Sequence, residues 1–186
     1  MKEKIVLIGI VLYFFVSHCF ISRAQELVKG DNGQAEKCLD AGKAFFKIGN
    51  LILSEYEFSK GLKLDPSNVE LLLALGKTYA FQKKFDEAYV QYNKVLNINP
   101  QNVIALNGLA DIYRLMNNYK EALETVNKAI EINPEYINSH LTLIEIYIGM
   151  GRKEDALQEY HSVEGKIPSS MKEKIGKIIQ GIISED

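Results

Sequence analysis

Apolar residues recur at three- and four-residue intervals over most of the chain, which is the spacing of helices with one buried side. The stretch LLLALGKTYAFQ, residues 71–82, shows this period, and FDEAYVQYNKVLNI, residues 85–98, shows it again. Between them the period breaks near Lys83 and Lys84. The pattern therefore predicts two short helices joined by a tight turn.

The same pair of patterns returns along the chain at a fixed interval. The prolines are evenly spaced, at Pro66, Pro100, Pro134 and Pro168. Other residue types keep this period, as Tyr79, Tyr113 and Tyr147 do at one position and Ala88, Ala122 and Ala156 at another. Such self-similarity is the signature of a repeat protein. The sequence predicts four helix pairs, over residues 35–68, 69–102, 103–136 and 137–170.

The residues between the predicted helices favour turns. The first helix of each pair is expected to end near Gly49, Lys83, Asn117 and Gly151, because glycine and asparagine suit the left-handed conformation that closes many helices. Proline ends the second helix, since it steers the preceding residue out of helical geometry. Ser67 to Glu70 and Ser170 to Glu173 have the spacing of a capping box, which predicts that the next helix starts there.

These residues resemble the tetratricopeptide repeat, whose pattern has fixed Leu, Gly, Tyr, Ala and Pro positions. The second copy reads Leu72-x2-Leu75-Gly76-x2-Tyr79, then Ala88-x3-Tyr92, then Pro100. The resemblance implies an all-α fold: a right-handed α-solenoid of four tandem 34-residue helix-turn-helix repeats. The first and fourth copies depart from the pattern, as terminal repeats commonly do, at Cys38, Ala41, Ser54, His140 and Ile144.

A further amphipathic helix is expected after the last proline, over residues 171–186. Its apolar stripe comprises Met171, Ile175, Ile178, Ile179, Ile182 and Ile183. Repeat arrays need a terminal element that covers the open end of the last repeat, so this segment is interpreted as a capping helix. A partner-binding or dimerising helix is the alternative.

The amino-terminal residues do not follow the repeat pattern. Residues 1–24 have lysines, an apolar core and small residues at a possible cleavage site, the layout of a secretory signal peptide. Two alternatives remain: a membrane anchor through residues 5–21, or a lipoprotein modified at Cys19. Residues 25–34 are expected to form a short flexible lead. We therefore expect an exported protein, periplasmic or secreted.

Composition and motifs argue against several classes of activity. A formal net charge of −2 does not favour nucleic-acid binding. Removal of residues 1–24 would leave Cys38 as a lone cysteine, so no internal disulfide is expected. No phosphate-binding loop, Cys-x-x-Cys, His-Glu-x-x-His or Gly-x-Ser-x-Gly motif occurs. His140 and His161 lie in one repeat without evident further zinc ligands, so we expect no metal, no cofactor and no enzyme.

What remains is a surface for another polypeptide. The resemblance implies that the first helices of the repeats line a concave groove. The corresponding residues are Leu39, Lys43, Phe46, Lys47, Leu73, Lys77, Phe81, Asn107, Asp111, Arg114, Leu141 and Glu145. Three lysines make the early part of this groove basic, and Asp111 and Glu145 make the later part acidic. A partner is expected to place its acidic end toward the first two repeats.

The predicted function is an exported scaffold or adaptor that binds a peptide or partner protein in this groove. Some relatives clamp a terminal carboxylate with Lys, Asn and Arg. The matching positions here do not rebuild that clamp, whether they are read as Leu39, Lys43, Ala74, Ile104 and Gly108 or as Leu73, Lys77, Gly108, Asn138 and Thr142. Two alternatives stay open: a structural subunit of a cell-envelope assembly that uses its convex face or terminal helix, and an unrecognised enzyme.

Overall fold

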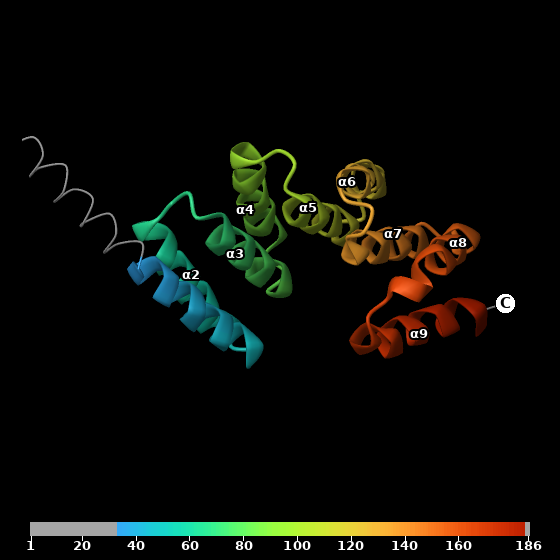
Figure 1. The fold of residues 1–186 in the computed structure, drawn as a ribbon, viewed down its shortest axis with the longest axis horizontal. Coiled ribbons are helices and arrows are strands. Elements are labelled where there is room, and N and C mark those ends of the chain that lie inside the picture. The colour runs from blue at the N-terminus through green and yellow to red at the C-terminus, as the bar shows by residue number, and fades with distance from the viewer. Residues whose placement is uncertain (1–32, 185–186) are drawn as a thin grey trace, which may run out of the picture. The chain divides into compact units, whose positions relative to one another are not determined.

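The computed structural model describes residues 33–184, and the regular structure in that range is helical (Figure 1). The chain divides into two compact units, Met1–Asn68 and Val69–Asp186, which are treated separately below. The predicted all-α fold is confirmed. The predicted signal peptide or anchor, and nearly all of the predicted flexible lead, lie outside the described residues. None of the described helices is both long enough and apolar enough to cross a bilayer.

The first unit contains one helix pair, a helix over residues 33–47 followed by α2 (Leu51–Leu64). The two helices cross closely because Gly42 has no side chain. A Cβ atom at this position would overlap the ring of Phe58, which is buried on α2. Cys38 is buried in the same core, and burial raises the pKa of its thiol above the usual value. A buried thiol with a raised pKa is a structural apolar group rather than a nucleophile.

The second unit repeats this pair three times and adds a terminal helix. Its elements are α3 (Val69–Phe81), α4 (Phe85–Ile98), α5 (Val103–Leu115), α6 (Tyr119–Ile132), α7 (Ile137–Gly149), α8 (Lys153–Val163), the 3-10 helix η1 (Glu164–Lys166) and α9 (Ser169–Ser184). Helices α3, α5 and α7 start at equal intervals along the chain, and α4, α6 and α8 keep the same interval. Each first helix packs on the second helix of its own pair, and α5 packs on the first helices of both neighbouring pairs. This tandem packing is that of an α-solenoid.

The turns within the pairs form at the four predicted residues. Gly49, Lys83, Asn117 and Gly151 all have positive φ, between 61° and 79°. At Lys83 the turn is a Schellman motif: the Lys84 N–H donates to the Tyr79 carbonyl at 2.9 Å, and the Lys83 N–H donates to the Ala80 carbonyl at 3.0 Å. These bonds satisfy carbonyls that the end of α3 would otherwise leave unpaired.

The caps at the start of the helices differ from the prediction. Helix α3 begins at Val69 and α9 at Ser169, so Ser67 and Ser170 do not stand directly before a helix. Ser67 donates to the Asp65 carboxylate at 3.2 Å instead. Asparagine caps the helix in the third repeat, where Asn102 Oδ1 accepts from the N–H of Ala105 at 2.9 Å. The predicted capping boxes are therefore wrong, because a serine placed one residue outside or inside the helix start cannot reach the free N–H groups.

Aromatic rings join neighbouring repeats. Tyr92 on α4 is buried, and its ring lies between two glycines, Gly76 on α3 and Gly108 on α5. A Cβ atom would come within 3.1 Å of the ring at Gly76 and within 2.5 Å at Gly108. Burial raises the pKa of Tyr92 far above its usual value, so the ring stays neutral. The small residues thus make room for the ring that fills the space between two helix pairs.

Helix α9 covers the last repeat with its predicted apolar stripe, but it buries different repeat positions from those that the first helix of a repeat buries. Ile175 and Ile179 are buried in one cluster with Ile144, Val163 and Ile167. The residues at these two positions in α7, Leu141 and Glu145, are only half-buried. The residues that α7 buries, Leu143 and Ile146, correspond in α9 to Lys177 and Gln180, which are exposed. Helix α9 is therefore turned about its axis relative to the first helix of a repeat. The other isoleucines of the predicted stripe have side chains outside the described part.

Candidate functional site

Three first helices of the second unit carry the candidate site. Helix α3 contacts α5, and α5 contacts α7, so the three lie side by side in chain order (Figure 1). We call their predicted surface the α3–α5–α7 face, formed by Leu73, Lys77, Phe81, Asn107, Asp111, Arg114, Leu141 and Glu145. The remaining predicted residues belong to the first unit, where Lys43 and Lys47 are exposed and Phe46 is half-buried.

One predicted apolar contact residue is buried, and another is half-buried against the core. Leu39 is only 6% exposed, so its side chain offers little surface to a partner. Leu141 packs against the buried cluster that Ile175 and Ile179 complete. Helical spacing alone could not distinguish these leucines from exposed ones, because both stand beside core positions of their helices.

The apolar part of the face lies at the ends of α3 and α5. Phe81 is 62% exposed in the last turn of α3, and Leu115 is exposed at the equivalent position of α5. Ile104 is exposed at the start of α5, and Leu73 is half-buried on α3. Large apolar side chains in contact with water, with charged residues around them, are typical of surfaces that bind another molecule.

The charged part of the face is a network rather than an acidic patch. Arg114 binds Asp111 on its own helix, with Nη2 at 2.6 Å from Oδ1, and reaches Glu145 on α7 at 3.2 Å. The guanidinium offsets one of the two carboxylates, so this part keeps an excess of one negative charge. All three side chains are partly buried, and the arginine joins α5 to α7. The sequence shows these charges, but only the packing of α5 on α7 brings Arg114 to Glu145.

Asn107 is the residue of the face with an unmet hydrogen-bond requirement. Its Oδ1 atom is buried and has no hydrogen-bond partner among the described residues. A buried acceptor without a partner costs about 1–3 kcal/mol of stability.

Replacing Asn107 with leucine is expected to raise the free energy of unfolding by about 1 kcal/mol, because an apolar side chain of similar size removes the unpaired oxygen. Urea denaturation of the two proteins measures the difference. Asn93, whose Nδ2 donates to the Tyr89 carbonyl at 3.0 Å, provides the control. Asn93→Leu should not stabilise the protein, and a stabilisation equal to that of Asn107→Leu would contradict the explanation.

The described residues contain no group of three or more His, Cys, Asp or Glu side chains that could hold a metal ion. The two histidines have separate partners. His140 Nδ1 lies 2.5 Å from Glu159 Oε1, and His140 Nε2 donates to the Pro134 carbonyl at 2.8 Å. His161 Nδ1 lies 3.4 Å from the Glu164 carboxylate. His140 on α7 thus contacts both α8 and the turn before α7, and the sequence alone did not reveal these contacts.

Comparison with solved structures identifies the fold. Crystal structures of MamA are similar, one with a TM-score of 0.62 and 23% identity over 82% of this chain and 86% of that one. The first TPR of Spaghetti (RPAP3) bound to the HSP90 peptide SRMEEVD gives a TM-score of 0.60 and 21% identity, over 64% of this chain and 95% of that one. The Arabidopsis OM64 TPR domain gives a TM-score of 0.60 and 17% identity, over 62% of this chain and 96% of that one. A search of curated protein sequences finds no match.

Family models agree with the structural likeness. One model described as tetratricopeptide repeat matches residues 68–135, and a second with the same description matches residues 116–170. The two matches overlap and together extend from the end of the first unit to the end of the fourth predicted repeat, which is more than half of the chain. The chain belongs to the tetratricopeptide repeat family.

Proposed function

We propose that this protein is a scaffold or adaptor that holds a segment of a partner protein on the α3–α5–α7 face. The exposure of Phe81 carries the proposal. A phenylalanine with 62% of its surface in water, beside the exposed Leu115 of the next repeat, gains free energy when a partner covers it. Both residues lie on helices, so binding need not order the backbone that carries them.

The chemistry of the face suggests the kind of segment that fits. Phe81 and Leu115 would bind apolar side chains, and the exposed Lys77 favours an acidic side chain near α3. The Arg114 network keeps an excess of one negative charge at the border with α7. The Spaghetti domain is solved with a peptide, which supports peptide binding as a use of this fold. Since the terminal-carboxylate clamp is not rebuilt here, we propose an internal segment as the ligand.

Phe81→Ala is expected to weaken binding of such a segment by about tenfold or more, because it removes the largest exposed apolar contact. Peptides selected from a display library on the full chain supply the probes, and isothermal titration measures their affinity. Ile98→Ala is the matched control, since Ile98 is 50% exposed at the end of α4, outside the face.

The two variants distinguish binding to the α3–α5–α7 face from binding near the end of α4. Loss of binding in Phe81→Ala with normal binding in Ile98→Ala supports the proposal. Equal affinity of both variants and the parent for every selected peptide contradicts it. Sedimentation tests the alternative function, that of a structural subunit in an assembly. A stable self-associated form that Ile98→Ala disrupts would favour this alternative.

We also propose that the protein is exported. The support is the sequence of residues 1–24, with its basic start, apolar core and small residues before Gln25. Mass analysis of the amino terminus of the native protein tests this. A chain that begins near Gln25 agrees with a cleaved signal peptide, whereas an intact or lipid-modified terminus identifies one of the alternatives.

A further inference from the structure

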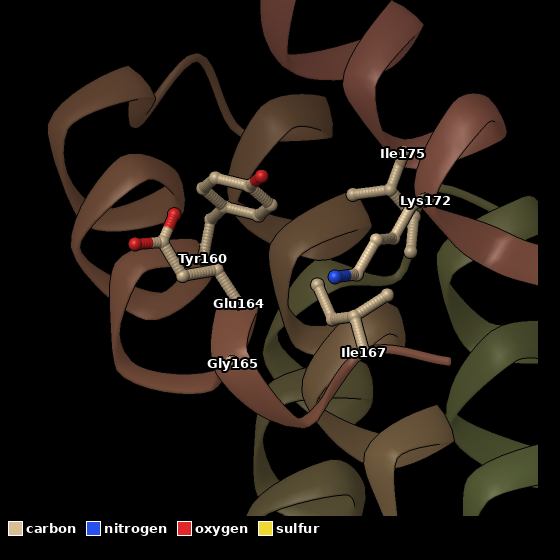
Figure 2. A pocket seen from close by; sticks show the side chains of 6 residues that line it. All are labelled: Tyr160, Glu164, Gly165, Ile167, Lys172 and Ile175. Atoms are coloured by element: carbon tan, nitrogen blue, oxygen red, sulfur yellow. The ribbon is translucent and has the colours of Figure 1, made fainter. Parts of the chain in front are cut away.

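A pocket lies between the last repeat and the terminal helix (Figure 2). Its volume is about 300 Å³, at the lower end of the range for small-molecule sites. The end of α8, the 3-10 helix η1 and the first turns of α9 form its walls. The lining residues are Tyr160, Glu164, Gly165, Ile167, Lys172 and Ile175.

The pocket arises where the packing between repeats ends. Inside the array the ring of Tyr92 is enclosed between α3 and α5, with Gly108 of the next repeat against it. Tyr160 occupies the same position in the last repeat, and Gly176 on α9 corresponds to Gly108. Gly176 has no atom near its would-be Cβ, and Tyr160 is only half-buried. The turned α9 therefore leaves open a space that an aromatic ring and a helix fill elsewhere.

The lining combines an apolar part with one inward cation. Ile167 and Ile175 are buried and supply aliphatic surface. In Figure 2 the Lys172 side chain extends from α9 toward Tyr160, while the Glu164 carboxylate is turned away from Lys172. Among the described residues Glu164 is an ion-pair partner of His161, and none is an ion-pair partner of Lys172.

We propose that this pocket binds a carboxylate carried on a short aliphatic body. The ammonium of Lys172 and the hydroxyl of Tyr160 can each donate to one carboxylate oxygen, and Ile167 and Ile175 cover the aliphatic part. One cation in the lining suits a single negative charge better than a phosphate dianion. A free short-chain acid and a polypeptide chain end with an aliphatic last residue share this chemistry.

Hexanoate, hexylammonium and hexanol are suitable probes because they share an apolar body and differ in charge. On the full chain, ligand-observed NMR should show hexanoate binding about tenfold more tightly than hexanol, and hexylammonium binding least, because only the carboxylate gains a charged hydrogen bond. Lys172→Gln should reduce hexanoate affinity to that of hexanol. Lys172 and Lys177 are both exposed lysines of α9, but Lys177 does not line the pocket, so the control Lys177→Gln should leave hexanoate affinity unchanged.

A second variant tests the pocket without altering charge. Gly165 lines the pocket and has open space where a Cβ would lie, so a larger side chain can start there without a clash at its Cβ, and Gly165→Leu is designed to occupy the cavity. It should abolish hexanoate binding at an unchanged melting temperature. Gly181→Leu, also at an open position, is the control and should bind normally. Full hexanoate binding to Gly165→Leu would overturn the proposal, as would equal affinity for hexanoate and hexylammonium.

The source of the carboxylate is distinguished by a further pair of probes. N-acetyl-leucine imitates a chain end, and N-acetyl-leucinamide is its neutral counterpart. Preference for N-acetyl-leucine over both the amide and hexanoate identifies a polypeptide end, and preference for hexanoate identifies a free acid. Binding of the amide as tight as that of N-acetyl-leucine would contradict a role for the charge.

Discussion

Gly108→Ala is expected to lower the free energy of unfolding by about 2 kcal/mol, within the range for overpacked cores. The new methyl group would lie 2.5 Å from the ring of Tyr92. Tyr92 is buried, so its ring has little free space into which to shift. This loss exceeds the roughly 1 kcal/mol that alanine gains over glycine in a helix. Urea denaturation followed by circular dichroism measures the change.

The next repeat shows how the same position accepts a larger residue. There Val126 replaces Tyr92 and Thr142 replaces Gly108. The double variant Tyr92→Val, Gly108→Thr copies this pair and should be more stable than Gly108→Thr alone. A double variant whose loss equals the sum of the two single losses would show that the ring and the glycine are not coupled. Gly76→Ala, with a 3.1 Å contact, should cost less than Gly108→Ala.

His140→Leu is the second substitution with a large expected effect, a loss of about 2 kcal/mol. Leucine is the residue at this position in the two preceding repeats, so pattern alone would favour the change. The structure predicts the opposite, because both ring nitrogens of His140 are in use. Without them the Glu159 carboxylate and the Pro134 carbonyl lose a partner in a largely buried place. Urea denaturation again provides the measurement.

The third repeat supplies the matching control for this pair. Its residues at the positions of His140 and Glu159 are Leu106 and Thr125. The double variant His140→Leu, Glu159→Thr removes the charge together with its partner, and should recover most of the stability lost in His140→Leu. If the double variant is less stable than His140→Leu, the carboxylate is not what makes the single substitution costly.

The sequence was sufficient for features that local chemistry decides. The constant spacing of the repeats placed the helix pairs, and turn residues such as Lys83 and Asn117 were identified by the break in the helical pattern. Ile175 and Ile179 were expected on the buried side of the last helix, and they are. These features depend on a few neighbouring residues, so a single sequence displays them.

Features that depend on the packing of separate helices were not accessible in this way. Leu39 has the spacing of a surface residue in its helix, but it is buried. Arg114 and Glu145 lie on different helices, as do His140 and Glu159, so the pairing of these charges follows from how α5, α7 and α8 meet. A pattern gives the face on which a side chain lies, but not which partner it meets there.

The turned terminal helix also limits how this architecture can lengthen. Helix α9 buries Ile175 and Ile179, while the position that is leucine in the first helix of each of the last three repeats is Lys177, which is exposed. A further unit packed on α9 would meet the exposed Lys177 where each of those repeats offers a buried leucine. Duplication of an internal unit, such as residues 103–136, would instead keep every junction between units that the chain already contains. Evolutionary growth or engineered extension is therefore expected upstream of the terminal helix.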